Sequence, residues 1–207
     1  YPLIDGVVNG CPSHLLEPQR TNLVTYSEDF SQWTKMGTPI VVSSSEISPN
    51  GTINAYDIID NSSGYEFISS NSISFNGTYT ASVFIKKTKG ALSNYAGLEV
   101  CLAGSYVIIN TTNGDINQTS NGYSNIKSED FNDWWRVSVT VTNTSVGSIF
   151  QIWSSISSNG TSISPSATGT NTFFGAQVEQ GSYPTSYIPN YGTAAGITRS
   201  AETANGA

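Results

Sequence analysis

The chain has few charged residues, and the negative ones outnumber the positive ones. Lysine and arginine together number 8 of 207 residues, aspartate and glutamate number 15, and the formal net charge is -7 at pH 7. Nucleic-acid binding requires clustered positive charge, so this balance argues against a nucleic-acid partner. The one basic cluster, Lys86, Lys87 and Lys89, is typical of a solvated strand end.

Hydrophobic runs of membrane-spanning length are also missing. No apolar stretch approaches the length that crosses a bilayer, and no basic segment precedes an apolar one as in a secretory signal. We therefore expect no membrane insertion. The chain starts at Tyr1 and ends in the small polar sequence "GTAAGITRSAETANGA", from which we expect a piece of a longer polypeptide with neighbouring domains.

Residue types that carry metal or nucleophile chemistry are scarce. His14 is the only histidine, and Cys11 and Cys101 are the only cysteines, which is too few for a zinc tetrahedron. Cys11 and His14 lie three residues apart without a third orienting group, so they do not match a nucleophile and its base. The two cysteines either pair or remain thiols, and the sequence leaves both possibilities open.

Acidic residues offer no better catalytic pattern. A glycosidase needs two acids that face each other across a cleft. No motif pairs any two of the candidates, which are Glu66, Glu99, Asp115, Glu129, Asp130, Asp133 and Glu179. Phosphate loops and dinucleotide fingerprints are absent as well. We predict that the chain is not an enzyme.

What the sequence does contain is alternation of apolar and polar residues with a period of two. This pattern predicts strands at residues 38–44, 54–60, 65–70, 79–87, 105–111, 134–144, 148–156 and 173–180, separated by Asn-Gly and Ser-rich turns. Many short strands with regular turns favour an all-β sandwich of two antiparallel sheets with little or no helix. The one helical turn that we expect is "YSEDFSQW", with Ser27 as its cap.

The alternation also separates inward from outward side chains. A sugar ring has an apolar face of C–H groups and a rim of hydroxyls, so exposed aromatic rings beside polar groups suit it. Burial under a crossing loop is the alternative for each ring. If their strands are neighbours in one sheet, the outward side chains form a single stripe: Phe84, Lys86, Trp134, Arg136, Gln151 and Trp153.

The stretch "FFGAQVEQGSYPTSYIP" combines a strand with an aromatic and proline-rich segment. Unbroken alternation predicts Phe174, Ala176 and Val178 in the core and Phe173 on the opposite face. The segment that follows, residues 183–189, contains Tyr183 and then, between Pro184 and Pro189, Tyr187 and Ile188; we call it the clamp. Prolines order a backbone at low entropic cost, so we expect the clamp to pack on the sandwich and to seal an edge strand.

Two stretches carry a family likeness: "TNLVTYSEDFSQW" at residues 21–33, and "GAQVEQGSYPTSYIP" at residues 175–189 followed by "TRSAE". With "YTASVFIKK" and "DWWRVSVTVTNT" between them, this order resembles a domain of bacteriophage tail, fibre and head-spike proteins. Its layout is similar to the jelly-roll carbohydrate-binding modules of secreted polysaccharide-degrading enzymes. The resemblance implies a jelly-roll β-sandwich with a ligand face and with Trp33 in its core.

The same resemblance implies a structural calcium near the first and last strands. Gly175 and Ala176 stand where an acidic ligand is expected, and they supply no carboxylate. The oxygen donors that remain are Glu28, Asp29, Asp57 and Glu179. Isolated acids are also common on protein surfaces, so the sequence leaves open whether these residues bind calcium or are ordinary surface groups.

These observations predict three parts: an N-terminal segment at 1–20 that packs on the domain, a jelly roll at 21–190, and a tail or linker at 191–207. We predict a non-catalytic module that binds polysaccharide or cell-surface glycan through the outward stripe, on a virion surface or in an extracellular protein. The alternative is a structural head-fibre or tail module whose exposed aromatics form a subunit interface and make the chain a homo-oligomer.

Overall fold

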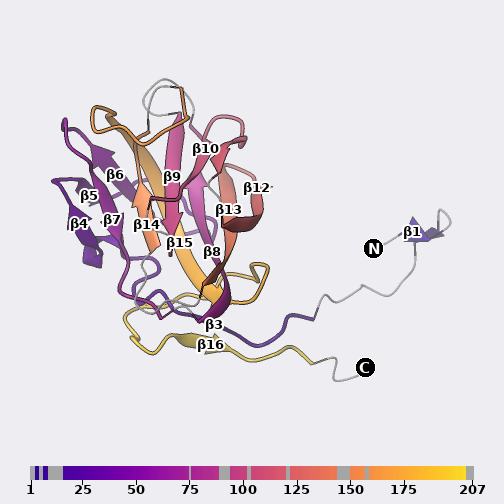
Figure 1. Cartoon of the computed structure of the whole chain (residues 1–207). Helices are drawn as coiled ribbons and strands as arrows, with labels where there is room; N and C mark the ends of the chain where they lie inside the picture. The colour runs from indigo at the N-terminus through magenta and orange to yellow at the C-terminus, as the bar shows by residue number, and fades with distance from the viewer. Residues whose placement is uncertain are drawn as a thin grey trace.

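The computed structural model is a sandwich of two six-stranded sheets (Figure 1). It describes residues 3–4, 7–8, 16–74, 76–88, 94–101, 104–119, 122–143, 150–156 and 159–203. The first sheet has the strand order β12-β13-β8-β15-β6-β5, and the second sheet has the order β11-β10-β9-β14-β7-β4. Neighbouring strands in both sheets pair antiparallel, so the predicted all-β sandwich is confirmed.

Each of the eight predicted strand regions contains one strand. The first sheet is built from β5 (Ile40–Ser43), β6 (Tyr56–Asp60), β8 (Gly77–Lys86), β12 (Tyr123–Phe131), β13 (Trp134–Asn143) and β15 (Gly169–Gln180). The second sheet is built from β4 (Thr34–Met36), β7 (Phe67–Ser69), β9 (Tyr95–Val100), β10 (Val107–Asn110), β11 (Ile116–Thr119) and β14 (Phe150–Trp153). The unpredicted strands include the edge strands β11 and β12, which are mostly polar; few side chains of β12 are buried, so its sequence shows little alternation.

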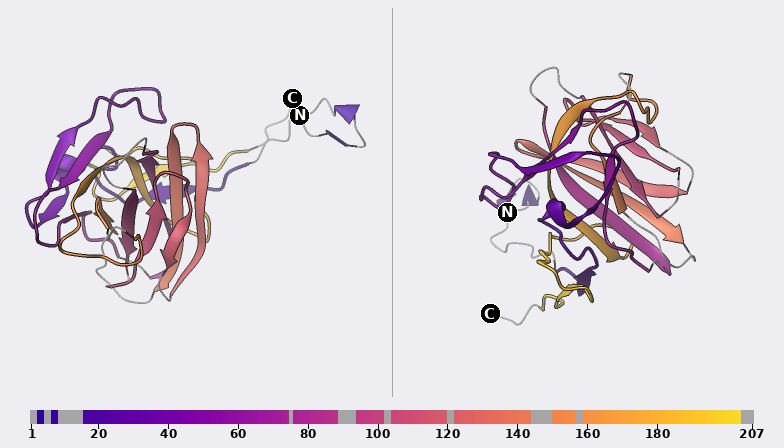
Figure 2. Two further views of the ribbon diagram at one scale, coloured as in Figure 1. Left: turned by 90° about the horizontal axis from the view of Figure 1, so that it is seen from above. Right: turned by 90° about the vertical axis from the view of Figure 1, so that its left-hand side faces the viewer.

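The two ends of the domain are tied together below the sheets. β3 (Arg20–Asn22) pairs with β16 (Ile197–Arg199), so a part of the predicted tail belongs to the folded domain. β1 (Leu3–Ile4) pairs with β2 (Val7–Val8), and β1 lies apart from the two sheets (Figures 1 and 2). His14 and Cys11 lie outside the described residues, so their predicted roles stay untested.

The predicted helical turn is a single 3-10 helix, η1 (Phe30–Gln32). Its cap is Asp29, whose Oδ1 accepts the N–H of Ser31 at 3.1 Å, and not Ser27 as predicted. The hydroxyl of Ser27 instead lies 2.6 Å from the hydroxyl of Tyr187 in the clamp. Within the described residues, no helix is long and apolar enough to cross a membrane.

The main core lies between the inner faces of the two sheets. Alternate residues of β8 and β13 are fully buried there, as the alternation predicted: Ala81, Val83, Ile85, Val137, Val139 and Val141. Trp33 joins this core, with its ring 5.0 Å from that of Phe30 and 5.8 Å from that of Phe150. The predicted core position of Trp33 is therefore confirmed.

Strand β15 departs from simple alternation at Gly175. Phe173, Ala176 and Val178 face the main core, whereas Phe174 faces the opposite side, so the predicted positions of Phe173 and Phe174 are wrong. The pairing of β15 with β8 shifts register between Phe174 and Gln177, and Gly175 has a φ of 62°. An extra residue in a strand reverses the faces of all residues beyond it, and glycine accepts the left-handed conformation that such a bulge needs.

The clamp covers a face of the first sheet and not an edge. β15 lies inside that sheet, between β8 and β6, so the predicted sealing of an edge strand is wrong. Tyr187 packs on the outer face, 6.3 Å from the ring of Phe84 and 5.5 Å from that of Phe174. The clamp therefore adds a third layer over the outer face of the first sheet.

Candidate functional site

The predicted stripe of outward side chains is split between opposite sides of the sandwich. β8 and β13 are neighbours in the first sheet, but β14 lies between β9 and β7 in the second sheet. The prediction of one continuous stripe is wrong, because Trp134 and Trp153 leave the main core in opposite directions. Alternation determines which face of its own sheet a side chain takes, but it does not determine which sheet a strand joins.

On the outer face of the first sheet, the predicted aromatic contacts are buried. Trp134 is 3% exposed, and its Nε1–H donates to the carbonyl oxygen of Ile47 at 3.1 Å. Phe84 is also buried and forms a second apolar cluster with Trp134 and Phe174, against which Tyr187 of the clamp packs. Of the two alternatives for Phe84 and Trp134, the structure shows burial, because a segment distant in sequence crosses this face.

The two basic side chains predicted for this face are already engaged. Arg136 is buried and donates to the carbonyl oxygen of Thr185 in the clamp. Nζ of Lys86 lies 2.7 Å from a carboxylate oxygen of Glu46 and 3.7 Å from one of Asp133. These ion pairs line a hollow of about 490 Å³, and they leave the ammonium group little capacity for a ligand.

On the outer face of the second sheet, Trp153 is the centre of an aromatic cluster. Its ring is 4.3 Å from that of Phe67, 6.1 Å from that of Tyr65 and 5.9 Å from that of Tyr106. Trp153 itself is 5% exposed, so its predicted exposure is also wrong. Tyr65 is 52% exposed, so it is Tyr65, with Trp153 behind it, that meets solvent.

Beside this cluster lies a hollow of about 360 Å³, which we call the Tyr65 hollow. Its lining residues are Tyr65, Gly104, Tyr106, Ile108, Thr161, Ser162 and Ile163. Neither tyrosine was among the predicted ligand residues. Each stands just before a strand, and packing against Trp153 from two different strands brings them together. A pair of tyrosines over an apolar floor with hydroxyls at the rim can hold a flat, polar-edged molecule.

Glu99 supplies a carboxylate next to the Tyr65 hollow. It lies on β9 opposite Gln151 of β14, and its Oε1 accepts the N–H of Gly104 at 2.9 Å. Burial raises the pKa of the Glu99 carboxyl, while the hydrogen bond from Gly104 lowers it. The pKa of the Tyr106 hydroxyl is raised by burial and by the charge of Glu99. Gln151, a predicted ligand residue, is buried beside this carboxylate.

Asp60 and Glu66 form a buried pair of acids in hydrogen-bond contact. Burial and the neighbouring Glu66 raise the pKa of Asp60 to about 7. Burial alone would raise the pKa of Glu66, but hydrogen bonds from Thr38, Ser62 and Asn61 lower it. Such a split resembles a catalytic pair, but the two side chains are 4% and 1% exposed and touch each other, which leaves no room for a glycosidic bond between them.

The four acids considered as calcium ligands each have other partners, and Oδ1 of Asp57 accepts from the hydroxyl of Thr172 at 2.6 Å. Oε2 of Glu28 accepts from the amide of Asn54 at 2.8 Å, and Oδ1 of Asp29 accepts from the hydroxyl of Tyr56 at 2.9 Å. Across the described ranges, no three His, Cys, Asp or Glu side chains gather to hold a metal ion. A calcium bound by Glu28, Asp29 or Glu179 stays an untested prediction.

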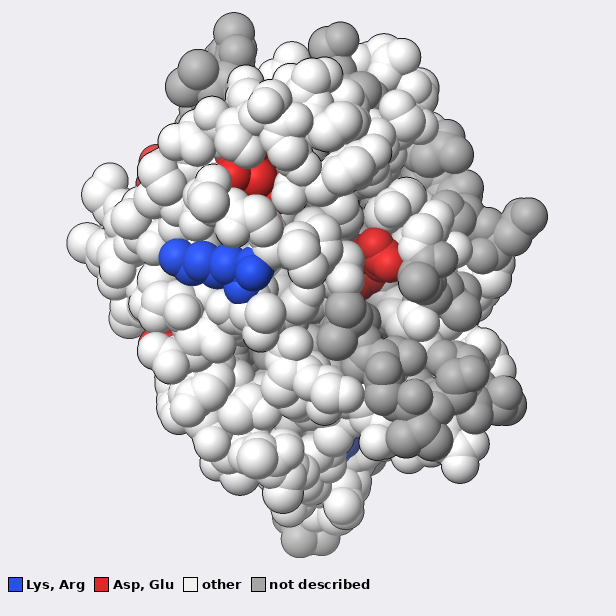
Figure 3. All heavy atoms as spheres, turned by 60° about the vertical axis from the view of Figure 1, so that its left-hand side comes forward, with Lys and Arg blue, Asp and Glu red and all other residues white. Residues whose placement is uncertain are grey.

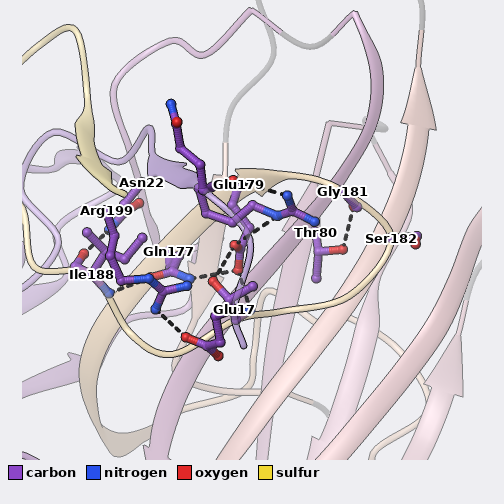
Figure 4. Close-up of polar contacts among 12 residues, drawn as sticks. Glu17, Asn22, Thr80, Gln177, Glu179, Gly181, Ser182, Ile188 and Arg199 are labelled. Carbon is purple, nitrogen blue, oxygen red and sulfur yellow. Dashed lines mark hydrogen bonds and ion pairs between the residues drawn. The ribbon is translucent and has the colours of Figure 1, made fainter. Parts of the chain in front are cut away.

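Glu179 is fully buried and is the centre of a polar network (Figure 4). Its Oε1 accepts from Nε2 of Gln177 and from the N–H of Thr185, each at 2.7 Å, and its Oε2 accepts from the hydroxyl of Thr185 at 2.7 Å. Nε of Arg20 lies 3.6 Å from Oε2. These contacts join β15 to the clamp and to β3, which is a structural role.

Charged side chains are few and separated on the side of the molecule that carries β4 and β5 (Figure 3). The basic residues with ion pairs include Lys86 and Lys87, at the end of β8, and Arg20 and Arg199, in the paired chain ends. The Tyr65 hollow itself is lined by neutral residues. Its chemistry therefore favours an uncharged ligand.

No protein family matches the sequence, and no curated protein does. Among solved structures, the chain is similar to part of a structure of the CBM22-1–GH10 modules of an endo-1,4-β-D-xylanase from Clostridium thermocellum in complex with xylohexaose. The TM-score is 0.50 at 16% identity, and the match covers 84% of this chain and 30% of that one. The chain thus spans less than a third of that two-module protein.

A second similar structure is the C-terminal CBM6 of LamC, a marine laminarinase from Zobellia galactanivorans. The TM-score is 0.33 at 12% identity, and the match covers 75% of this chain and 97% of that one. The first likeness establishes the fold: the two-sheet sandwich is a jelly roll like that of carbohydrate-binding modules.

Proposed function

We propose that this domain is a non-catalytic carbohydrate-binding module that holds a neutral polysaccharide in the Tyr65 hollow. The observation that carries the proposal is the pairing of exposed Tyr65 with Tyr106 over a hollow whose lining is uncharged. Sugar rings stack on such side chains through their C–H faces, and the hydroxyls of Thr161 and Ser162 suit the polar rim of the ring.

The jelly-roll fold supports the same proposal, because the similar xylanase structure contains a carbohydrate-binding module and a xylan oligosaccharide. A few stacking contacts and hydrogen bonds predict weak binding at a single site, with Kd on the order of micromolar to millimolar. Several copies on one particle or enzyme would then bind through avidity.

Replacing Tyr65 by alanine tests the site directly. Because this ring is half exposed and meets Trp153 in a T-shaped contact at 6.1 Å, we expect glycan affinity to fall by about 10-fold or more while the melting temperature changes by about 2 °C or less. Affinity electrophoresis against soluble polysaccharides measures the first, and a thermal melt the second. The control is Tyr183→Ala, which removes an exposed tyrosine of the clamp. Equal binding by both variants would refute the assignment.

Replacing Glu99 by glutamine tests the preference for neutral glycans. An ionised carboxylate near the hollow repels anionic ligands, so the wild type is expected to bind carboxymethylcellulose about 10-fold more weakly than hydroxyethylcellulose if it binds that backbone. In Glu99→Gln, the difference in affinity between the two cellulose derivatives should be smaller. Glu129→Gln, an exposed acid on the first sheet, changes the net charge equally and should leave this difference unchanged.

We place the module on a virion surface or in an extracellular enzyme or adhesin. The support is the sequence likeness to phage appendage domains and the fold likeness to a module of a polysaccharide-degrading enzyme. The alternative, a structural module with an aromatic subunit interface, would have to use rings other than Phe84, Trp134 and Trp153, because these three are buried.

A further inference from the structure

The acid pair described above stands at the base of the segment that carries Tyr65. Asp60 ends β6 in the first sheet, and Glu66 directly precedes β7 in the second sheet. Oε1 of Glu66 accepts the N–H of Thr38 at 3.1 Å and its hydroxyl at 2.7 Å, while Oε2 accepts the N–H of Asn61 at 3.1 Å. The carboxylate of Glu66 therefore holds the segment 61–66 at both of its ends.

Asp60 lacks the full set of hydrogen-bond donors and the opposite charge that a buried carboxylate requires. Its Oδ1 is buried without a hydrogen-bond partner among the described residues. The groups that act on its carboxyl are Glu66 and the N–H of Ser62, so the one charge facing Asp60 is negative. Two buried carboxylates in contact do not both ionise readily, and they share one proton instead.

We infer that Asp60 and Glu66 form a proton-operated latch on the Tyr65 segment, so that the Tyr65 hollow binds glycan more tightly in mildly acidic solution than in alkaline solution. The inference rests on the proposed glycan site. While protonated, Asp60 donates a hydrogen bond to Glu66 and the segment stays closed. Loss of that proton to solvent leaves two adjacent negative charges, whose repulsion displaces the segment and Tyr65 with it.

The direction of the pH dependence follows from the titration of Asp60. Its pKa is raised from 3.8 to about 7, so the protonated form stabilises the fold at low pH and this stability is lost as the pH rises through 7. The pKa of Glu66 is lowered, so the stability that its carboxylate contributes is lost as the pH falls. This loss occurs only below about pH 4.5. Between about pH 5.5 and about pH 8.5, Glu66 therefore stays ionised, and Asp60 is the member of the pair that titrates.

Thermal melts without ligand test the latch itself. The melting temperature should fall by on the order of 5 °C from about pH 5.5 to about pH 8.5, and this fall should vanish in Asp60→Asn, whose neutral amide still donates to Glu66. Asp115→Asn, an exposed acid, should keep the fall. A flat wild-type profile, or an unchanged fall in Asp60→Asn, overturns the latch.

Binding at the two pH values tests the coupling to the hollow. With soluble xylan and β-glucan as probes, wild-type affinity should weaken about 5-fold at the alkaline pH, and the affinity of Asp60→Asn should not change. If the titration of Glu99 also changed glycan affinity, that change would persist in Asp60→Asn. The variant therefore distinguishes an effect of Glu99 from an effect of Asp60. A pH-dependent melt with pH-independent binding overturns the coupling alone. Absence of binding to any polysaccharide at either pH overturns the proposed function. The thermal melts without ligand would still test the proton-operated latch, because they do not depend on glycan binding.

Discussion

Replacing Glu179 by alanine is expected to lower the free energy of unfolding by about 3–5 kcal/mol. The carboxylate is fully buried and accepts three hydrogen bonds from Gln177 and Thr185. Its removal leaves these donors without their acceptor and leaves Arg20 without its buried counter-charge, and each unpaired buried group costs free energy. Urea denaturation followed by tryptophan fluorescence measures the loss.

The matched control is Glu17→Gln. Glu17 also bonds the clamp, through the N–H of Ser186 at 2.8 Å, and pairs with Arg199, but it lies at the surface. We expect it to cost about 1 kcal/mol or less, because a solvated ion pair contributes little. Equal losses in the two variants would show that burial of Glu179 does not carry the effect.

Replacing Trp153 by alanine is expected to destabilise the fold by about 3–5 kcal/mol, in contrast to the small effect that an exposed ring would have. The ring packs between Phe67, Tyr65 and Tyr106, and its removal opens a cavity behind the Tyr65 hollow. Thermal or urea unfolding measures this directly. A loss of glycan binding in this variant would not identify Trp153 as a contact residue, because the floor that supports both tyrosines is lost as well.

Trp153→Phe is the companion variant. Phenylalanine keeps one aromatic ring against Phe67 and removes Nε1, which is buried without a hydrogen-bond partner among the described residues. We expect a cost of about 1–2 kcal/mol and retained glycan binding. Full stability of the alanine variant would contradict the burial of this side chain.

The pieces of sequence with the strongest family likeness turn out to hold the domain together. The side-chain oxygen of Asn22, in the opening stretch, accepts the N–H groups of Val24 and Val178, and its amide donates to the carbonyl oxygens of Ala176 and Ile188. These hydrogen bonds tie β3 to β15 and to the clamp, which is a structural role. They carry no information about the ligand.

Strands and core were accessible from the sequence because alternation is a local property. A strand with one face in the core must place apolar residues at every second position; β8 does so from Tyr79 to Ile85, and β13 from Trp135 to Val141. The glycine inside β15 was the one local sign of the bulge that reverses its faces, and glycine inside a strand is a known marker of such a bulge.

Exposure and the composition of the site could not be obtained in this way, because both depend on segments that are distant in sequence. Tyr187 of the clamp buries Phe84, and β13 and β14 follow each other in the chain yet join opposite sheets. Tyr65 and Tyr106 become neighbours only through Trp153. Local pattern thus determined that this chain folds as an all-β sandwich, whereas long-range packing decided which of its aromatic rings meet water.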